Sequence, residues 1–480
     1  MSLNIIASWA SKTPNGVAII YNGQSVSYSA FTSAILGVLV ELDKEGLPNE
    51  GTVAVLVDNL RDCWVITLAI RAIGLDTVCI NSWRLLEDIG IPDVHAVITS
   101  ISDVKRGFVA PAGAIVVANP SFDADAALTS PPCAQSGGHT LYTSGTTGHY
   151  KKLYWTGEQL ARCAEQRAKS PVYSSNPETV SYLHDFGLWT AVGFKYPLST
   201  WLGGGSVIFE QRPDWYRYFM DSGLTSTLLV PDMVNQLLDY QLTRAEPSKR
   251  GDFVLGVTSG FLSRKSAEQC LTHITTFLTI NYGATEINSS GMYSRITDLD
   301  DMHWLEAKDP DRFEIVQEDG TAAEYEEGEL RIHLTDYDCA RYEDDSAASA
   351  KVFRDGYFYP GDRAIKRADG RIRVIGRNID AINYNGHKYA AAPLEQDIQS
   401  LLGVSNVCIL SGLNGSSAEE IIIAIEADRL PEKPKLDALA RKMFRLSKVR
   451  YAQMKRFPRT ETGTHKINRR ALRGMLFGNN

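Results

Sequence analysis

The chain has 480 residues, and because 44% of them are hydrophobic it can bury several apolar cores. A formal net charge of −8 disfavours general binding to nucleic acid or to anionic membranes. The N-terminus lacks the basic start and sustained apolar stretch of a signal peptide, and no run of about 18 apolar residues follows. We therefore expect a multidomain cytoplasmic protein without membrane insertion, whose partners are small molecules or other proteins.

The seven cysteines are scattered along the chain, and none lies in the C-x-x-C spacing of a zinc site or redox pair. An odd number of cysteines also cannot pair completely into disulfides. We expect reduced thiols that mostly fill the core.

Strand-like and helix-like segments alternate through the first 300 residues. The series begins with an apolar run at Val17–Ile20, a segment of helical period at Tyr28–Leu42 and a second apolar run at Thr52–Val57. Cys63–Ile73 has helical period, and Thr77–Ile80 again has the length of a strand. Later segments of the same two kinds are Ala96–Thr99, Ala114–Ala118, Gly157–Ala168, Ser206–Phe209, Ser226–Val230, Asp232–Leu242 and Phe277–Asn281. This alternation predicts one large α/β body with largely parallel, buried strands.

The sequence pattern changes from about Glu314, where short apolar segments are interrupted by glycine and aspartate. Closely spaced strands of this kind predict a small sheet or barrel. The last hundred residues alternate again and predict a compact α+β lid, with segments at Leu394–Leu402, Val404–Leu410, Glu420–Ala427 and Leu436–Arg445. The expected fold is a large α/β N-terminal domain with a barrel-like part, residues 1–376, and a smaller α+β C-terminal lid domain, residues 380–480.

The segment Thr143–Lys151 has the composition of a phosphate-binding loop. It contains four serine or threonine hydroxyls, two glycines and a lysine. Glycines let backbone N–H groups close on an anion, hydroxyls donate to its oxygens, and a lysine neutralises its charge. A solvated Ser/Thr/Gly turn is the alternative, and it is the commoner interpretation of such a loop by itself. The G-x-x-x-x-G-K-[ST] pattern of P-loop proteins does not occur in the sequence.

Four further motifs favour the interpretation of this loop as a phosphate-binding loop. They follow it in this order: Asn281–Glu286, which reads N-Y-G-A-T-E, then Gly361-Asp362, Gly376-Arg377 and Pro458–Lys466. The ordered set resembles the AMP-forming adenylating superfamily, which includes acyl- and aryl-CoA synthetases, the adenylation domains of nonribosomal peptide synthetases and firefly luciferase. The resemblance extends over nearly the whole chain. It implies that ATP activates a small-molecule carboxylic acid as an acyl-adenylate, with release of pyrophosphate.

In this family the glycine-rich loop wraps the β- and γ-phosphates of ATP. The resemblance gives that role to Thr143, Ser144, Gly145, Thr146, Thr147, Gly148 and Lys151. The family's proline before the lysine is replaced here by Tyr150. Because proline fixes φ, this replacement is expected to alter the stiffness of the loop more than its phosphate chemistry.

The motif after the predicted strand Phe277–Asn281 is implied to bind the nucleotide and the metal. Tyr282 would stack on adenine, Gly283 would line the pocket, and Thr285 would hydrogen-bond the α-phosphate. Glu286 would help to hold Mg²⁺, which prefers carboxylate and phosphate oxygens. For Tyr282 alone, an ordinary aromatic side chain at a strand end is the alternative.

Three residues nearer the C-terminus complete the implied ATP site. Asp362 would accept hydrogen bonds from both ribose hydroxyls, and Arg377 would contact the same ribose or a phosphate. Lys466 is implied as the catalytic lysine of the lid, where it would bridge the attacking carboxylate and the α-phosphate and stabilise the charge of the transition state. The alternatives are a turn residue or surface ion pair for Asp362 and Arg377, and a solvated basic tail for Lys466.

Five residues are candidates for the acid pocket, and one of them is Gly283, which also belongs to the nucleotide motif. His184 matches an H-x-x-G pattern whose histidine gates the pocket or approaches the carboxylate, although a lone histidine is more often a satisfied core residue. Asp185 lies where amino-acid adenylation domains place the aspartate that pairs with the substrate's amine. Gly260 and Phe261 lie where the family has small residues, and the bulk of Phe261 favours a small or aromatic acid over a long chain.

The acceptor in the second half-reaction is implied to be a thiol, either CoA or the phosphopantetheine of an acyl or peptidyl carrier protein. The family's hinge residue for lid rotation is replaced here by Ile379, which needs only to absorb backbone rotation. Two alternatives stay open. One is a free-standing amino-acid adenylation enzyme that loads a carrier protein, and the other is a homologue that binds ATP or acyl groups without catalysis.

Overall fold

A computed structural model describes the chain over residues 2–47, 50–81, 94–105, 114–122, 136–144, 150–170, 175–244, 249–288, 291–317, 319–323, 325–377, 381–384, 387–413, 419–430, 436, 438, 449–460 and 466–477. Among the helices of these residues, none combines the length and the apolar character that are needed to cross a bilayer. Six of the seven cysteines lie in the described residues, where all six are buried and none forms a disulfide.

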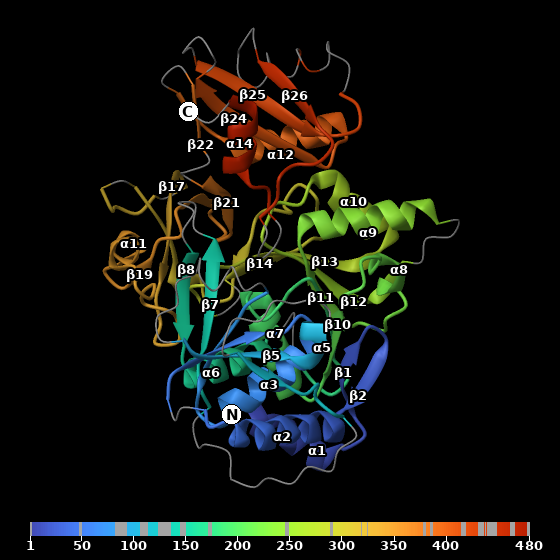
Figure 1. Cartoon of the computed structure of the whole chain (residues 1–480). Coiled ribbons are helices and arrows are strands. Elements are labelled where there is room, and N and C mark those ends of the chain that lie inside the picture. Colours follow the sequence, from blue (N-terminus) through green and yellow to red (C-terminus); the bar gives the residue numbers. More distant parts are fainter. Residues whose placement is uncertain are drawn as a thin grey trace.

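The largest sheet runs through one side of the body (Figure 1). Its strand order in the described residues is β15-β14-β13-β12-β11-β9-β10-β1-β2. The run from β13 to β1 is parallel, whereas β14, β15 and β2 are antiparallel to their neighbours. The strands are β1 Val17–Tyr21, β2 Gln24–Ser27, β9 Val180–His184, β10 Ser206–Glu210, β11 Ser226–Leu229, β12 Arg250–Val257, β13 Thr275–Tyr282, β14 Met292–Arg295 and β15 Glu306–Ala307.

A second sheet carries the predicted phosphate loop. Its order in the described part is β6-β5-β3-β4-β7-β8, parallel except for the antiparallel pair β7–β8. The strands are β3 Thr52–Leu56, β4 Asp76–Cys79, β5 Val94–Ser100, β6 Ile115–Val117, β7 His139–Ser144 and β8 Tyr150–Trp155. Central strands such as β3 are almost wholly buried, which explains why they read as continuous apolar runs in the sequence.

Two buried helices pack on each other inside the body. α3 and α7 are apolar on nearly all sides, as a helix surrounded by protein must be, and Trp64 stacks on Phe194 at 5.2 Å between ring centroids. Side-chain oxygens of Asn59 and Thr190 cap their first turns. The body's helices are α1 Ser2–Lys12, α2 Tyr28–Lys44, α3 Leu60–Ala72, α5 Ile101–Lys105, α6 Gly157–Ala168, α7 Ala191–Leu202, α8 Tyr216–Phe219, α9 Pro231–Thr243 and α10 Arg264–His273.

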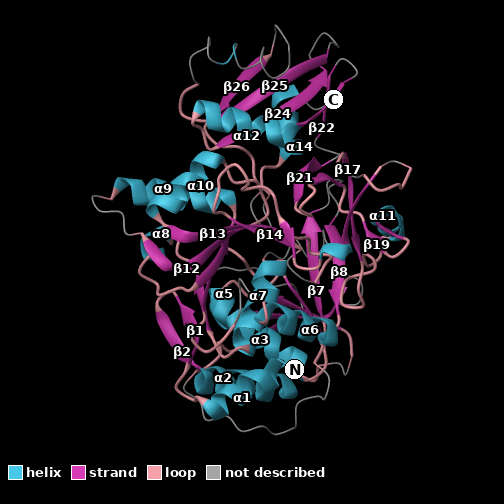
Figure 2. Ribbon diagram, turned by 180° about the vertical axis from the view of Figure 1, so that it is seen from behind, coloured by secondary structure: helices cyan, strands magenta, loops and turns pink. Residues whose placement is uncertain are grey.

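A smaller antiparallel sheet follows, in the region for which the sequence predicted a small sheet or barrel. Its order in the described residues is β18-β19-β17-β20-β21, and β16 also pairs with β17. The elements are the 3₁₀ turn η1 Pro310–Arg312, β16 Phe313–Val316, β17 Glu327–His333, α11 Ser346–Val352, β18 Phe353–Arg354, β19 Tyr357–Phe358, β20 Asp362–Lys366 and β21 Ile372–Arg377. Figure 2 shows this sheet beside β7 and β8.

The described residues from 381 onward form the C-terminal unit, which lies at one end of the molecule (Figure 1). It has its own buried core, which includes Ile398, Ile409 and Ile423. Its elements are β22 Ala381–Tyr384, β23 His387–Ala390, α12 Ala391–Leu402, β24 Asn406–Leu413, β25 Glu419–Glu426, β26 Arg450–Met454 and α14 Arg469–Phe477. Most of the predicted helix Leu436–Arg445 lies outside the described residues. The domain boundary between 376 and 380 stays a prediction.

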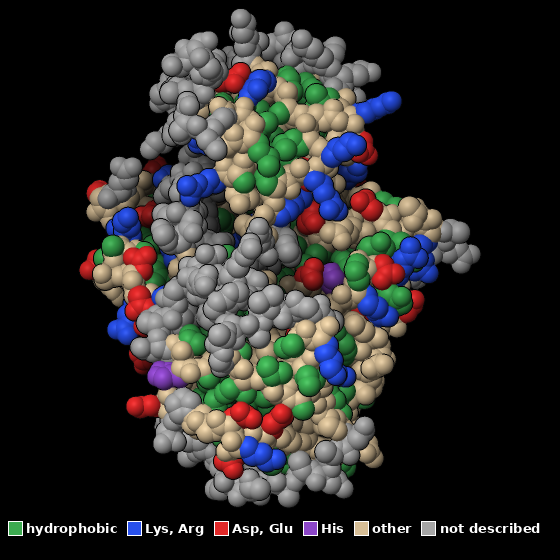
Figure 3. All heavy atoms as spheres, viewed as in Figure 1, with side chains coloured by type: hydrophobic (Ala, Val, Ile, Leu, Met, Phe, Trp, Pro, Cys, Tyr) green, Lys and Arg blue, Asp and Glu red, His purple; other side chains and the backbone are tan. Residues whose placement is uncertain are grey.

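The C-terminal unit touches the body through polar groups. Basic side chains gather along the edge of the unit that faces the body, opposite acidic side chains of the body (Figure 3). Arg459 pairs with Asp232 at the start of α9, at 3.2 Å. Lys265 of α10 donates to the carbonyl of Gly403, just after α12, at 3.4 Å. The Arg459–Asp232 pair is partly exposed, and a single ion pair of this kind contributes little stability.

Candidate active site

Four parallel strands of the large sheet end at one edge, and the predicted acid and nucleotide residues follow those ends. β9 is followed by Asp185, β11 leads into Pro231 at the start of α9, β12 is followed by Gly260 and β13 by Gly283. In open α/β sheets the crevice outside the carboxyl ends of the strands is where ligands bind. The fold therefore brings together sequence segments that are about a hundred residues apart.

Tyr282 and Asp362 meet at this edge. The Tyr282 hydroxyl donates to Oδ2 of Asp362 at 2.7 Å, which joins the end of β13 to the start of β20. Asp362 is buried, and in the β20–β21 ladder it lies opposite Arg377. Gly361 has a φ of +77°, a conformation that side chains rarely adopt, so a glycine suits the turn that delivers Asp362. Three residues from separate motifs thus converge in one place.

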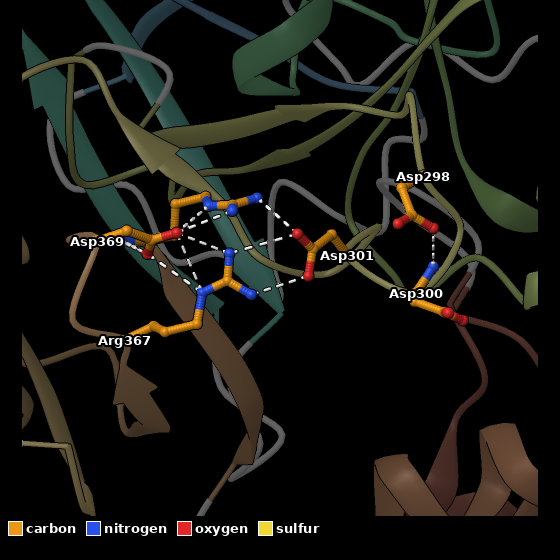
Figure 4. Close-up of polar contacts among 6 residues, drawn as sticks. Asp298, Asp300, Asp301, Arg367 and Asp369 are labelled. Atoms are coloured by element: carbon orange, nitrogen blue, oxygen red, sulfur yellow. Dashed lines mark hydrogen bonds and ion pairs between the residues drawn. The ribbon is translucent and has the colours of Figure 1, made fainter.

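The hairpin β20–β21 is anchored through its turn. Arg367 pairs with Asp301 at 2.8 Å and with Asp369 at 2.7 Å, and Arg371 reaches the same two carboxylates (Figure 4). The hydrogen bond from Arg367 holds the pKa of Asp369 well below its usual range. A network of several charges holds geometry better than one exposed pair does. It fixes the far end of the hairpin that carries Asp362 and Arg377.

Tyr342 joins the phosphate hairpin to the predicted metal ligand. Its hydroxyl donates to Oε1 of Glu286 at 2.7 Å, and the Lys151 ammonium lies 4.7 Å from the centre of its ring. Lys151 is opposite Thr143 in the β7–β8 ladder, so both ends of the predicted phosphate loop are held in a hairpin. Cation–π contacts of this kind contribute about 0.5–2 kcal/mol. Lys151 and Glu286 therefore share one partner.

The tip of the predicted phosphate loop, with Gly145, Thr146, Thr147 and Gly148, lies outside the described residues. Ser144 ends β7 and is opposite Tyr150, the residue that replaces the family's proline. The ring of Tyr150 meets that of Tyr142 edge-on, at 5.7 Å between centroids and 89°. Edge-on pairs are a favoured aromatic arrangement, so Tyr150 packs against the strand that it faces.

His184 and Asp185 lie at the end of β9. Nδ1 of His184 is 2.8 Å from the carbonyl oxygen of Glu210, its Nε2 is 3.4 Å from Asp185, and its ring stacks on Trp215. Asp185 is exposed and adopts a φ of +55°, in the left-handed region that is uncommon outside glycine. The histidine is thus buried and hydrogen-bonded, while the aspartate faces outward. Their proposed roles with the acid stay predictions.

Gly260 and Phe261 follow β12. A Cβ added at Gly260 would come within 3.1 Å of the Pro231 ring, so the glycine keeps this approach open. Phe261 meets His303 edge-on, at 5.8 Å between ring centroids. Burial and, to a smaller degree, Arg373 lower the pKa of His303 to about 4. His303 lines a cavity of about 580 Å³ between the body and α12.

Lys466 lies in the C-terminal unit, with an exposed side chain. Its carbonyl accepts a hydrogen bond from the Thr460 amide at 2.8 Å, and Ile467 forms an isolated bridge with Arg459. These contacts connect the two sides of the 461–465 segment, which lies outside the described residues. The catalytic role of Lys466 stays a prediction.

The residues present fit a magnesium ion that is held mainly by phosphates. Within the described residues there is no group of three or more His, Cys, Asp or Glu side chains that could hold a metal. Mg²⁺ in nucleotide sites usually takes one or two carboxylates and completes its shell with phosphate oxygens and water. The Glu286 carboxylate is buried, and it has acceptor capacity beyond the bond from Tyr342. One carboxylate beside a phosphate hairpin suits that chemistry.

A comparison with protein families assigns the chain to a known one. A family model described as "AMP-binding enzyme" matches residues 6–333, which is more than half of the chain. The chain therefore belongs to the family of AMP-binding enzymes. This membership confirms the resemblance that the five motifs indicated.

Individual relatives are distant. Luciferin 4-monooxygenase from Photuris pensylvanica is 24% identical over 280 residues, and the match covers 53% of this chain and 48% of that protein. The chain thus spans about half the length of this relative. 2-Hydroxy-7-methoxy-5-methyl-1-naphthoate–CoA ligase from Streptomyces carzinostaticus is 24% identical over 444 residues, with 81% of this chain and 77% of the ligase covered.

The whole fold also has solved counterparts. The o-succinylbenzoate CoA synthetase MenE from Bacillus subtilis, in complex with its acyl-adenylate intermediate, superposes with a TM-score of 0.80. The match covers 99% of both chains at 18% sequence identity. The likeness confirms the predicted fold class, a large α/β body with a smaller C-terminal part.

The sequence motifs missed two residues that hold the site together. Tyr342 belongs to none of the motifs, and its bond to Glu286 spans 56 residues, so the sequence carried no local signal for it. Lys195 contacts the segment after β13 from inside α7. The sequence did contain a hint of this role, because Lys195 is the single charged residue of an otherwise apolar and neutral helix.

Proposed function

We propose that the protein uses ATP to convert a small-molecule carboxylic acid into an acyl-adenylate and then transfers the acyl group to a thiol. Residues 1–376 would bind ATP and the acid, and residues 380–480 would supply the catalytic lysine. The observation that carries the proposal is the pairing of separate motifs in space: Tyr282 hydrogen-bonds Asp362, and Tyr342 joins Glu286 to Lys151. Tyr282, Asp362, Glu286 and Lys151 come from three motifs and suit different parts of Mg-ATP.

Binding and orientation account for most of the chemistry in this proposal. Asp362 would bind the ribose hydroxyls, Tyr282 would stack on adenine, and Arg377 would contact the ribose or a phosphate. The β7–β8 hairpin would hold the β- and γ-phosphates through its loop and Lys151. Mg²⁺, held by Glu286 and phosphate oxygens, would neutralise negative charge where two anions must approach each other.

The reaction itself is an in-line displacement at the α-phosphorus. An oxygen of the acid's carboxylate forms a bond to the α-phosphorus, and the bond to the bridging oxygen of the β-phosphate breaks. Pyrophosphate leaves with that electron pair, and a mixed anhydride of the acid and AMP remains. Lys466 and Thr285 would stabilise the charge that develops on the transferring group. Alignment of the two reactants lowers the barrier further.

The acceptor of the acyl group is proposed to be a thiol, CoA or a carrier protein's phosphopantetheine. The relatives named as CoA ligases and the CoA synthetase fold support this choice. The lid would rotate about the segment that contains Ile379 to admit the thiol. A small or aromatic acid is proposed because the bulky Phe261 stands where the family has small residues; its ring meets that of His303.

Acid-dependent exchange of labelled pyrophosphate into ATP tests the first half-reaction. A panel of short-chain, aromatic, long-chain and α-amino acids is assayed with Mg²⁺, and the active acids are then incubated with CoA to detect the thioester. We expect exchange with small or aromatic acids and a thioester with CoA. Exchange with none of the acids contradicts the proposed function.

A second candidate, the amino-acid adenylation enzyme, rests on Asp185. Its carboxylate is exposed at the end of β9, where an amine could approach it. Exchange driven by α-amino acids alone, and abolished by Asp185→Ala, would establish this candidate in place of the first. A homologue without catalysis would bind ATP, measurable by calorimetry, but would show no exchange with any acid.

A further inference from the structure

Lys195 is a buried lysine in the middle of α7. Its side chain is almost completely shielded from solvent, and its ammonium lies 3.4 Å from the centre of the Trp155 ring. Lysine is almost never fully buried without partners, because removing an ammonium group from water is costly. Its partners should therefore reveal what the lysine does.

The partners of Lys195 are two backbone carbonyls of the segment Thr285–Asn288, which we call the β13 turn. Nζ donates to the carbonyl oxygens of Thr285 and Ile287, each at 3.4 Å. The residue between them, Glu286, is the predicted magnesium ligand, and Thr285 is the predicted partner of the α-phosphate. The lysine thus holds the backbone on both sides of Glu286.

Other elements bind the two remaining carbonyls and the Asn288 amide of the β13 turn. The carbonyl of Glu286 accepts from the Cys339 amide at 3.0 Å, and that of Asn288 accepts from Sγ of Cys163 at 3.0 Å. The amide of Asn288 donates to Asp338 at 2.7 Å. Each of the four successive carbonyls therefore accepts a hydrogen bond, and Lys195 is the donor to two of them.

We propose that Lys195 is a positioning residue, which fixes the β13 turn so that the Thr285 hydroxyl and the Glu286 carboxylate face the nucleotide. It acts through the backbone and does not touch the substrate itself. Non-helical backbone such as this turn has no ladder of its own to hold it, and a single side chain that binds two of its carbonyls supplies that constraint. The catalytic part of this inference rests on the proposed function.

Hydrogen exchange and kinetics of Lys195→Met test the proposal. Methionine keeps the length of the side chain but cannot donate to either carbonyl. We expect faster exchange of the Asn288 amide in the free protein, because this amide lies in the turn that is loosened. We also expect kcat for acid-dependent pyrophosphate exchange to fall about 10- to 100-fold, since small misplacements of catalytic groups are costly. The KM for the acid should stay within about threefold, because most of the residues proposed for the acid pocket follow β9 and β12 rather than β13.

Two further variants control the experiment. Lys249→Met removes an exposed lysine that donates to the carbonyl of Leu271, and it should change neither exchange at Asn288 nor kcat. Lys195→Gln retains a donor for one carbonyl and should lose less than Lys195→Met; it decides the question if the methionine variant does not fold.

Unchanged exchange of the Asn288 amide in a folded Lys195 variant would overturn the proposal. So would a wild-type kcat in a variant of an active enzyme. If the wild-type protein activates no acid at all, the proposed function fails, while hydrogen exchange still decides whether Lys195 positions the turn.

Discussion

The hydroxyl of Tyr282 donates to the carboxylate of Asp362 at 2.7 Å, across 80 residues of sequence. The bond joins the last residue of a parallel strand in the large sheet to the first residue of a hairpin in the small antiparallel sheet. A hydrogen bond to an ionised acceptor is stronger than a neutral one, so it orients both side chains before any ligand arrives. Adenine and ribose would thus meet groups whose positions are already coupled.

Replacing Asp362 with alanine should raise the KM for ATP by more than about tenfold, because the ribose loses its acceptor and Tyr282 loses its partner. Tyr282→Phe keeps the ring and loses one hydrogen bond, which corresponds to about 1 kcal/mol and to a three- to tenfold increase in KM. Steady-state kinetics with ATP as the varied substrate measures both. Tyr357→Phe, which removes a 3.0 Å bond from a tyrosine to Glu314 in the same small sheet, is the matched control. Equal KM values in all three variants would contradict the assignment.

Tyr342→Phe should lower kcat about tenfold and raise the Mg²⁺ concentration needed for half-maximal activity. The hydroxyl of Tyr342 orients Glu286, and loss of a donor to a buried carboxylate costs about 1–3 kcal/mol. Phenylalanine keeps the ring that Lys151 contacts, so the KM for ATP should change less than kcat does. Titration of pyrophosphate exchange with Mg²⁺ provides the measurement. An unaltered Mg²⁺ dependence would show that Tyr342 does not act through the metal ligand.

Lys466→Ala should reduce adenylation by two orders of magnitude or more, because the transition state loses its main counter-charge. The substitution is in an exposed position, so the folded state should keep its thermal midpoint within about 1–2 °C. Lys455→Ala removes another exposed lysine of the C-terminal unit and should leave the rate unchanged. A rate for Lys466→Ala that equals the wild-type rate would refute the role of this lysine.

Protonation of His303 should destabilise the protein in mild acid. Burial lowers its pKa to about 4, below the value of about 6.5 in an unfolded chain, so the unfolded chain binds the proton more tightly. The stability that the neutral imidazole contributes is therefore complete above pH 6.5, and it is lost as the pH falls from 6.5 to 4. The difference between the two pKa values corresponds to about 3 kcal/mol at most.

Thermal midpoints measured between pH 7 and pH 4 test this prediction. The midpoint of the wild-type protein should fall more steeply across this window than that of His303→Gln, which cannot titrate there. His333→Gln, at an exposed histidine, should follow the wild-type curve. Parallel curves for wild type and His303→Gln would contradict the prediction.

Local sequence patterns predicted many elements of the body, although β9, α7 and β12 were not among the predictions. The predicted helix Gly157–Ala168 has the same bounds as α6, because the residues of its N-terminal capping box and its apolar positions are close together in the sequence. Four strands of the large sheet, β1, β10, β11 and β13, were predicted from short apolar runs because both of their faces are covered. The order of the strands could not be predicted from the sequence. β10 pairs with β1 across nearly 190 residues, and only tertiary packing selects that partner.

The candidate site was predictable where a motif keeps chemistry together in sequence. Tyr282 and Glu286 belong to one such motif, but the contact of Glu286 with Tyr342 depends on how two sheets pack. For His184, the sequence motif suggested a role but could not specify the surroundings of the side chain. Its motif predicted a gate, whereas the structure adds a stack on Trp215 and a bond to the Glu210 carbonyl, neither of which the sequence could specify.

The strands β9, β11, β12 and β13 occur in the same order along the chain and across the sheet, although β10 branches off to the other side of β9. The positions proposed to line the acid pocket, apart from Lys466 of the C-terminal unit, are therefore encoded in one continuous stretch of about a hundred codons, from residue 180 to residue 288. This stretch also contains α7, so an exchange of the stretch would include both Lys195 and the turn that it contacts. Exchange of this cassette between members of the family should therefore transfer the preference for an acid while leaving the β7–β8 hairpin unchanged.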